Sequence, residues 1–339
     1  MEEKTLFNWQ RKALSESAGR NSYGLFSDPG TGKTYCALRI AQNWTDNALV
    51  VCPLSVKEQW VKEANIVGIP TEVYHYEQLR NKRYFDVIVN KLRGNRTTLI
   101  LDESHRIKSP STATTKAALK IAPLAPARLA LTGTPTANSP ADLYTQLKFL
   151  QPERKLETYR DFQSEYVEEL PASHPLRKKI PGRPFLAMKR KDGSLVTKNI
   201  DKLKKRRSEY GITVKLDEVV ELPERTFLTR MCSPDSELLK TYKELQKNYI
   251  AKFKNKEVTA QNAAVLAGRL TRLTSGYGHA DFDVSFPNPK LKELVADIGS
   301  FVAAGKCIVW SVWVSERNDA MDALGERGYR VTLDPGEFV

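Results

Sequence analysis

The sequence predicts an α/β fold in which a parallel sheet carries helices on both faces. Three observations predict it: short apolar strands alternate with helix-compatible stretches, a glycine-rich loop joins the first strand to a helix, and an acidic pair follows a later strand. The composition then changes, and one more strand–helix–strand pattern comes late in the sequence. We expect a first lobe at 1–150, a helical and basic insertion at 151–215, and the beginning of a second lobe at 216–339.

Continuous apolar runs of strand length predict the sheet of the first lobe. The predicted strands are 22–27, 48–53, 71–77, 97–103 and 128–135. Helices are predicted between them, at 32–44, 56–64, 85–92 and 141–150. The stretch "FDVIVNKL" could be extended, but Phe85, Ile88, Val89 and Leu92 recur at helical spacing, so it is predicted as a helix. Strands that alternate with helices favour parallel pairing.

The segment after residue 151 has a different character. Residues 174–208 hold thirteen Lys and Arg but only two Asp, and four prolines and glycines fall in "HPLRKKIPGRP". This composition predicts a loop-rich basic insertion. Helices are then predicted at 235–255, 259–275 and 290–303, and a strand–helix–strand unit at 306–314, 315–328 and 329–334.

The bulk composition limits the classes of function. The net charge of +13 favours an acidic polymer, most often nucleic acid, as the partner. Cys36, Cys52, Cys232 and Cys307 form no C-x-x-C pair, which indicates reduced thiols in a reducing compartment. The N-terminus lacks the apolar core of a signal peptide, and no run of 18 apolar residues occurs, so we expect a cytoplasmic protein.

The stretch "SDPGTGKT" at 27–34 has the form of a phosphate-binding loop between a strand and a helix. Its glycines permit positive φ, so backbone N–H groups can converge on phosphate at the helix N-terminus. Lys33 would contact the β- and γ-phosphates, and the Thr34 hydroxyl would ligate Mg²⁺. Ser27 stands where the usual formula has glycine, and an ordinary glycine-rich turn is the alternative. The residues expected to bind ATP are Asp28, Pro29, Gly30, Thr31, Gly32, Lys33 and Thr34.

An acidic pair supplies the partner that such a loop needs. Asp102 and Glu103 follow the apolar strand of "TTLILDESH", at the edge where parallel sheets hold ligands. Asp102 would hold Mg²⁺ and Glu103 would polarise the attacking water, so the expected catalytic residues are Lys33, Asp102 and Glu103. His105 is either a packed histidine or a residue that couples this pair to the next strand.

The next strand ends in "LTGTPTANSP", where hydroxyl groups would lie beside the acidic pair. Thr132, Gly133 and Thr134 could sense whether γ-phosphate is present. The alternative is a capped strand-to-helix turn, because Ser139 suits an N-cap and Pro140 suits the first helical position.

In this order, the motifs resemble those of the Swi/Snf-type ATPases of helicase superfamily two. "FNWQRKAL" resembles the glutamine motif, "SDPGTGKT" motif I, "VVCPLSVKEQW" motif Ia, "LDESHRIKSP" the DEAH-like box, "LTGTPTANSPADLYTQLKFLQP" motif III, and "GKCIVWSVWVSERNDAMDALGERGYRVTLDPG" motif IV. The resemblance covers nearly the whole chain, is weakest at 151–210, and favours the compact phage or bacterial members. It implies RecA-like lobes, and a non-glycine residue at the first loop position is common in this family.

The resemblance implies an ATP-dependent translocase that moves along double-stranded DNA through contacts with phosphates, with Gln10 reading the adenine edge. A small-molecule kinase is disfavoured, because nothing resembles an acceptor site. Motifs V and VI, which carry the family's arginine finger, are not found in the sequence, and Arg269 and Arg272 precede motif IV. Further second-lobe sequence or a partner chain would supply the finger. The alternative is a nucleotide-dependent DNA-binding module with little turnover.

The DNA contacts are expected at two places. Ser55 could cap the helix "VKEQW", with Glu58 completing a capping box, so that its N-terminus faces a phosphate. The basic insertion either grips DNA or is a solvated protrusion, and it holds only one aromatic residue, which disfavours base stacking. The candidate DNA-binding residues are Ser55, Lys57, Arg106, Lys108, Lys204, Lys205, Arg206 and Arg207.

Overall fold

A computed structural model describes most of the chain. The described residues are 5–94, 96–175, 185–224, 226–248, 250–253, 256–259, 263–279, 282–303 and 305–333. The chain divides into two compact units, Met1–Pro223 and Glu224–Val339. The predicted division into lobes at 150 and 215 stays a prediction.

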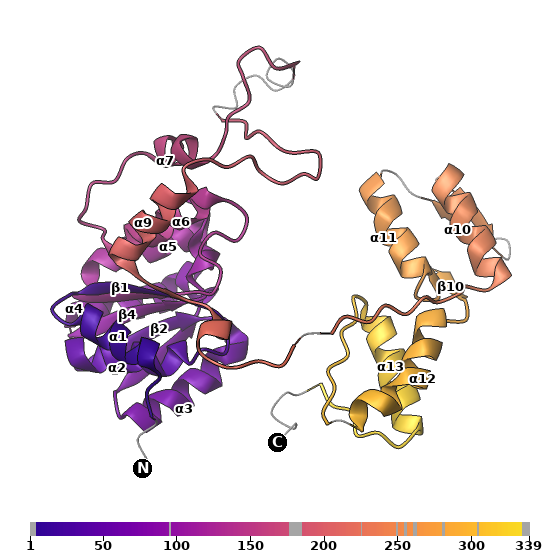
Figure 1. The fold of residues 1–339 in the computed structure, drawn as a ribbon, viewed down its shortest axis with the longest axis horizontal. Coiled ribbons are helices and arrows are strands. Elements are labelled where there is room, and N and C mark those ends of the chain that lie inside the picture. The colour runs from indigo at the N-terminus through magenta and orange to yellow at the C-terminus, as the bar shows by residue number, and fades with distance from the viewer. Residues whose placement is uncertain are drawn as a thin grey trace. The chain divides into compact units, whose positions relative to one another are not determined.

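A six-stranded sheet forms the centre of the first unit (Figure 1). Its strand order is β3-β2-β4-β5-β1-β6, and each neighbouring pair is parallel. The strands are β1 Ser22–Ser27, β2 Asn47–Cys52, β3 Thr71–His75, β4 Thr97–Asp102, β5 Ala127–Leu131 and β6 Gly211–Val214. The predicted α/β fold of the first lobe is therefore confirmed.

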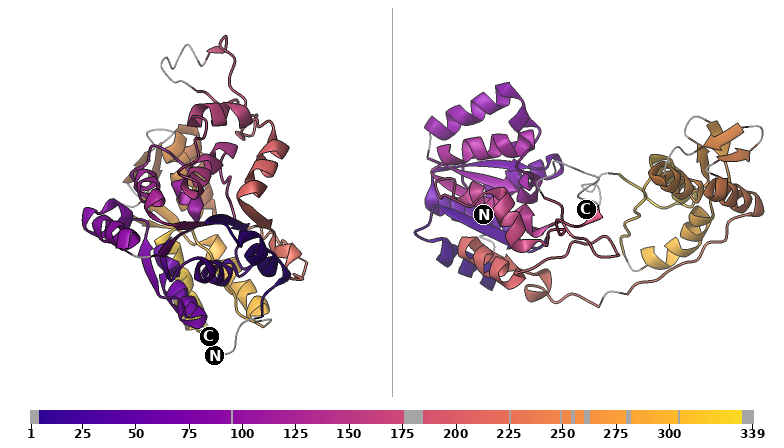
Figure 2. Two further views of the ribbon diagram at one scale, coloured as in Figure 1. Left: turned by 90° about the vertical axis from the view of Figure 1, so that its left-hand side faces the viewer. Right: turned by 90° about the horizontal axis from the view of Figure 1, so that it is seen from above.

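Helices cover both faces of this sheet (Figure 2). They are α1 Asn8–Ser17, α2 Lys33–Trp44, α3 Lys57–Val67, α4 Lys82–Gly94, α5 Ala113–Ile121, α6 Leu143–Leu150, α7 Tyr159–Tyr166 and α9 Ile200–Tyr210. Along β2, Leu49 and Val51 join the core under α4 to α6, whereas Val50 and Cys52 join the core under α1 to α3. Successive side chains of a strand point to opposite faces, which explains why the predicted strands are apolar throughout.

Strand β6 was not predicted, and it comes from beyond the basic insertion. It pairs with β1, and Gly24 lies opposite Gly211. A Cβ atom on Gly211 would lie 1.9 Å from the carbonyl oxygen of Gly24, so the approach requires glycine. The chain thus returns to the first unit after the insertion and adds an edge strand beside the phosphate-binding loop.

The insertion is more ordered than its composition predicts. Its last part forms α9, and antiparallel bridges join Val167 to Thr197, Glu169 to Ala187 and Lys189 to Leu195. Leu203 and Tyr210 of α9 are buried in the first unit's core. Residues 176–184 of the predicted insertion lie outside the described residues.

The second unit consists of helices and short hairpins. The helices are α10 Ser236–Asn248, α11 Ala263–Leu273, α12 Pro289–Val302 and α13 Val314–Glu326. The antiparallel hairpins are β7 Ile250–Phe253 with β8 Lys256–Thr259, and β9 Tyr277–His279 with β10 Phe282–Ser285. The predicted helix at 235–255 therefore ends earlier than expected, and β7 follows it.

The two strands predicted around α13 are wrong for the residues that the structure describes. Residues 305–313 and 329–333 form no strand there, although the helix between them was predicted correctly. Trp310 is 89% exposed, and Ile308 and Val312 are also exposed. A strand needs a neighbour to receive its backbone hydrogen bonds, and no neighbouring strand pairs with these segments in the described part of the unit.

No helix within the described ranges combines the length and the apolar character needed to span a bilayer.

Candidate nucleotide-binding site

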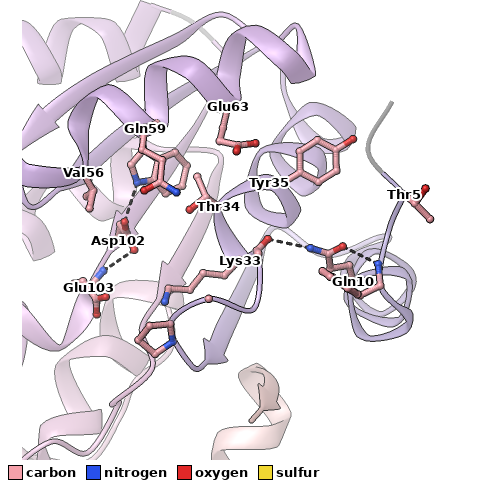
Figure 3. A pocket seen from close by; sticks show the side chains of 15 residues that line it. Thr5, Gln10, Lys33, Thr34, Tyr35, Val56, Gln59, Glu63, Asp102 and Glu103 are labelled. Carbon is pink, nitrogen blue, oxygen red and sulfur yellow. Dashed lines mark hydrogen bonds between the residues drawn. The ribbon is translucent and has the colours of Figure 1, made fainter. Parts of the chain in front are cut away.

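A cleft of about 460 Å³ opens where the loop after β1 meets α1, α3 and the end of β4 (Figure 3). Three of the predicted sites meet there: the glutamine motif, the phosphate-binding loop and the acidic pair. The lining residues are Thr5, Phe7, Gln10, Pro29, Gly30, Gly32, Lys33, Thr34, Tyr35, Val56, Gln59, Trp60, Glu63, Asp102 and Glu103.

The loop has the backbone shape that its sequence predicts. Gly30 and Gly32 have φ angles of 83° and 82°, in the left-handed region that favours glycine. Lys33 and Thr34 begin α2, and the Lys33 side chain runs from the loop toward Asp102 and Glu103 (Figure 3). Anions are favoured at such a helix N-terminus because its first N–H groups have no partner within the helix.

Two of the predicted loop residues hold the loop rather than line the cleft. Asp28 Oδ2 accepts a hydrogen bond of 3.0 Å from the backbone N–H of Leu216, and the N–H of Asp28 donates to the carbonyl of Val214. Thr31 Oγ1 donates to the carbonyl of Asp28 at 2.8 Å. The two bonds of Asp28 tie the loop to the end of β6 and to the segment that follows it, and the bond of Thr31 closes the loop on itself.

Gln10 connects the first helix to the loop. Its Nε2 donates to the carbonyl of Gly32 at 3.0 Å, and its Oε1 accepts from the N–H of Phe7 at 2.9 Å. Gln10 is 3% exposed. Since an amide has two N–H bonds and two lone pairs, a ligand could still use one of each. The predicted contact with adenine stays a prediction.

The carboxylate of Asp102 is fixed at both oxygens. Oδ2 accepts from the indole N–H of Trp60 at 2.8 Å, and Oδ1 accepts from the backbone N–H of Glu103 at 3.0 Å. The Tyr76 hydroxyl donates to the backbone carbonyl of Asp102 at 2.7 Å. Burial raises the pKa of Asp102, and the bond from Trp60 opposes that shift.

Glu103, His105 and the end of β5 form one polar network. His105 Nδ1 lies 2.9 Å from Thr132 Oγ1 and 3.2 Å from Glu103 Oε2. The hydrogen bond with His105 is the largest cause that holds the pKa of Glu103 below its ordinary value. The N–H of Thr134 donates to Thr132 Oγ1 at 3.1 Å. The structure thus brings His105 into contact with both the acidic pair and the predicted motif III.

Gly133 places this network against the phosphate-binding loop. A Cβ atom there would lie 2.9 Å from Pro29 Cδ and 3.3 Å from the carbonyl oxygen of Ser27. Only a residue without a side chain allows this approach. The predicted capped turn is also present, because Ser139 Oγ accepts from the N–H of Ala141 and Asp142 Oδ2 accepts from the N–H of Ser139.

The oxygen groups of the cleft suit a hard divalent cation. The Thr34 hydroxyl and the Asp102 carboxylate both face the cleft (Figure 3), and Mg²⁺ prefers oxygen ligands. Mg²⁺ commonly uses one or two protein groups together with nucleotide phosphates and water. In the described part of the chain, no group of three or more His, Cys, Asp or Glu residues has an arrangement that could hold a metal ion by itself. The predicted Mg²⁺ ligands fit this mode of binding.

Sequence reasoning missed several residues of the cleft. Trp60 and Tyr76 hold Asp102, and Tyr35, Gln59 and Glu63 line the cleft from α2 and α3. Trp60 belongs to the quoted motif Ia, yet nothing in the sequence indicates that its indole N–H reaches a carboxylate 42 residues later.

Of the four candidate DNA contacts near the cleft, Ser55 does not have the predicted capping role. Ser55 does not cap α3: it lies in a 3₁₀ turn, Leu54–Val56, and the N-cap residue Val56 provides no side-chain cap. The turn keeps Ser55 out of the capping position, although it remains exposed. Lys57 is the first residue of α3.

The other two candidates follow β4. Arg106 lies 3.6 Å from Glu77 and over the ring of Tyr76, and Lys108 follows a 3₁₀ turn.

The four basic candidates on α9 are not equivalent. Lys204 and Lys205 are exposed, with Lys204 paired to Asp201 at 3.0 Å. Arg206 is 19% exposed, bonds the carboxylate of Glu157 with both terminal nitrogens, and lies 4.9 Å over the ring of Phe162. Burial lowers the pKa of Arg207. Arg206 therefore has a structural partner already.

Arg269 and Arg272 lie on α11 in the second unit, as the predicted helix requires. Arg272 lies over the rings of Tyr277 and Trp313, at 6.0 and 5.8 Å.

Comparison with known proteins places the chain in a family. A protein from Caenorhabditis elegans, the "SWI/SNF-related matrix-associated actin-dependent regulator of chromatin subfamily A-like protein 1 homolog", is 29% identical over 48% of this chain and 26% of its own length. The "Probable global transactivator" of Orgyia pseudotsugata multicapsid polyhedrosis virus is 28% identical over 44% of this chain and 34% of its own length. The bovine "DNA annealing helicase and endonuclease ZRANB3" is 26% identical over 48% of this chain and 17% of its own length.

These matches span about a third or less of each relative. Among solved structures, the "Sulfolobus solfataricus SWI2/SNF2 ATPase core in complex with dsDNA" has 19% sequence identity and a TM-score of 0.48, and the match covers 95% of this chain and 70% of that one. The profile of the SNF2-related domain matches residues 69–275, which is more than half of the 339 residues. The chain therefore belongs to the SNF2-related domain family.

Proposed function

We propose that this protein couples ATP hydrolysis to movement along double-stranded DNA. One observation carries the proposal: a single cleft brings together Gln10, the carboxylates of Asp102 and Glu103, and four residues of the phosphate-binding loop, Gly30, Gly32, Lys33 and Thr34. That set provides a site for phosphates, oxygen ligands for a cation, and an acidic group for the attacking water. Membership in the SNF2-related domain family supports the same reaction.

Each residue of the cleft has a distinct part in the proposed reaction. Lys33 would neutralise the charge on the terminal phosphates, and Thr34 and Asp102 would hold Mg²⁺. The bound cation would neutralise charge that develops on the transferred phosphoryl group. Glu103 would orient water, and its low pKa keeps it in the carboxylate form that accepts a hydrogen bond from that water. His105 would report the state of this site to Thr132 and Thr134.

DNA as the partner is supported by charge and by relatives. The chain has a net charge of +13, and Lys204 and Lys205 are exposed on α9. Phosphate contacts from such residues give affinity that does not depend on sequence and weakens with salt. Relatives named as a chromatin regulator and as a DNA annealing helicase support a duplex partner.

The decisive experiment measures ATP hydrolysis with and without duplex DNA. We expect stimulation by duplex DNA in the wild-type chain and loss of turnover in Lys33→Ala. Lys62→Ala is a matched control, because Lys62 is an exposed lysine of α3 outside the cleft and should keep wild-type turnover. Displacement of a third strand from a duplex then tests for movement, and turnover without displacement would contradict translocation.

The alternative function, a nucleotide-dependent DNA-binding module, predicts a different result in the same experiment. Nucleotide would change the affinity for duplex DNA, Lys33→Ala would remove that change, and DNA would not stimulate hydrolysis. Stimulated turnover that depends on Lys33 would exclude this alternative.

A further inference from the structure

The indole of Trp60 reaches the nucleotide cleft from the first turn of α3. Its Nε1 lies 2.8 Å from Asp102 Oδ2, whose carboxylate is labelled in Figure 3. Trp60 is 1% exposed, so water cannot replace the donor without a rearrangement of the core. The other carboxylate oxygen of Asp102 accepts from the N–H of Glu103. Two donors on two different elements therefore fix the plane of the carboxylate.

Packing alone does not explain why position 60 holds a tryptophan, whose indole carries an N–H donor. Trp60 belongs to the core under α1 to α3, where a phenylalanine ring would also be apolar. Other tryptophans of this chain use their N–H groups differently: Trp44 donates to the backbone carbonyl of Ser17 at 3.1 Å, and the Nε1 atoms of Trp9 and Trp313 are buried with no partner in the described structure. At Trp60 the N–H instead meets a charged acceptor, where a hydrogen bond is about twice as strong.

The bond from Trp60 links the position of the whole helix α3 to the Asp102 carboxylate. The helix lines the cleft with Gln59, Trp60 and Glu63, and Lys57 lies one turn before Trp60 on the same face. A shift of α3 would therefore move the Trp60 indole, and with it the carboxylate of Asp102.

We propose that Trp60 is a positioning residue that holds the Asp102 carboxylate in the orientation needed for the Mg²⁺–nucleotide complex. The proposal rests on the proposed function only for the identity of the ligand. It predicts that removal of the N–H weakens the part of nucleotide binding that depends on Mg²⁺ and leaves the remainder intact, because the loop and Gln10 do not depend on Trp60.

The test compares Trp60→Phe with Trp44→Phe. Both substitutions remove an indole hydrogen bond, but the bond of Trp44 lies on a backbone carbonyl outside the cleft. The dissociation constant of a fluorescent ADP analogue is measured with Mg²⁺ and with EDTA. We expect Trp60→Phe to reduce the tightening by Mg²⁺ about tenfold or more, since hydrogen bonds to charged groups are strong. Trp44→Phe should keep the wild-type ratio.

Binding in EDTA reports whether the variant is folded. Should Trp60→Phe fail to bind there, benzothienylalanine at position 60 replaces the N–H by sulfur and keeps the ring shape. In the Asp102→Asn background, Trp60→Phe should cause little further loss of the Mg²⁺ effect, because both changes remove the same interaction.

The outcomes separate this proposal from the proposed function. Equal Mg²⁺ effects in Trp60→Phe, its benzothienyl counterpart and Trp44→Phe would overturn the positioning role, even if ATP turnover is robust. A wild-type chain that binds Mg²⁺–nucleotide but does not hydrolyse it would contradict the proposed translocase function. The comparison of Trp60→Phe with Trp44→Phe would still test the positioning role. A wild-type chain that binds no nucleotide would overturn both.

Discussion

The side-chain amide of Gln10 donates a hydrogen bond to the backbone carbonyl of Gly32, with 3.0 Å between Nε2 and O. The bond ties α1 to the loop that is expected to hold phosphate. A Cβ atom on Gly32 would lie 2.8 Å from the same Nε2 atom, and Gly32 has a φ angle of 82°. The backbone conformation therefore favours glycine at this position, and a Cβ atom there would displace the amide of Gln10 from its bond with the loop.

We predict that Gly32→Ala abolishes nucleotide binding. The substitution strains the backbone by about 1–2 kcal/mol and also pushes Gln10 away from the loop. Gly19→Ala is the matched control, because Gly19 has a φ angle of 75° but a Cβ atom there would meet no other atom of the described structure within 4 Å. Titration with a fluorescent nucleotide should show loss of binding only in Gly32→Ala. Because Gly19 lies outside the loop, equal losses of binding would mean that backbone strain acts by destabilising the whole first unit, and that the contact with Gln10 has no separate effect.

The strands of the first lobe could be predicted from the sequence because they are buried on both faces. Runs such as residues 99–101 must be apolar at every position of a sheet with helices on both sides, so strand positions stand out. The phosphate-binding loop was equally readable, since Gly30 and Gly32 are required by positive φ angles that other residues rarely adopt.

The remaining features depend on contacts that no local pattern records. Apolar residues such as Ile308 and Trp310 favour a strand, but a strand forms only where another strand receives its hydrogen bonds. Strand β6 has only four residues, and its place is set by the close approach of Gly24 and Gly211. The bond between Trp60 and Asp102 joins residues 42 positions apart, so neither motif predicts it alone.

We predict that His105→Ala shifts the acidic limb of the pH–turnover profile to higher pH. The bond with His105 lowers the pKa of Glu103, so its removal raises that pKa and the carboxylate is protonated earlier as the pH falls. Turnover should therefore fall at a higher pH in the variant. Because the ordinary pKa of a glutamate is 4.5 and that of Glu103 lies below it, steady-state ATP hydrolysis from about pH 3 to about pH 7 measures the shift.

The matched control for this prediction is His75→Ala. His75 also lies beside a carboxylate, at 3.0 Å from Glu77 Oε2, but neither residue lines the cleft. Its profile should match that of the wild type. A profile for His105→Ala that overlays the wild-type curve would show that Glu103 does not limit turnover at acidic pH.

We predict that Arg206→Ala destabilises the first unit by about 1.5–3 kcal/mol, because hydrogen bonds to a charged partner are lost. The charged partner is Glu157. The side chains of Arg206 and Glu157 are each less than a third exposed, and the guanidinium of Arg206 also covers the ring of Phe162. Lys205→Ala, at an exposed position of the same helix, should change stability by less than about 0.5 kcal/mol. Urea denaturation measures both variants, and equal midpoints would contradict a structural role for Arg206.

We predict that the double substitution Lys204→Ala and Lys205→Ala flattens the salt dependence of DNA binding without a loss of stability. Each phosphate contact that is removed should reduce the slope of log K against log salt by about 1. Fluorescence anisotropy with duplex DNA at several salt concentrations measures the slope. A slope equal to that of the wild type would place the DNA contact away from α9.

We predict that the stability difference between the wild type and Arg206→Ala narrows at acidic pH. Arg206 is the largest cause that lowers the pKa of Glu157 from its ordinary value of 4.5. A carboxylate with a lowered folded-state pKa contributes its full stabilisation above the unfolded-state pKa, and this is lost as the pH falls through the folded-state pKa. The difference in urea midpoint should therefore be constant from about pH 7 to about pH 5 and shrink below pH 4.5. If the difference were the same at about pH 3 and about pH 7, packing of the guanidinium on Phe162 would account for the stabilisation, because that contact does not depend on the charge of Glu157.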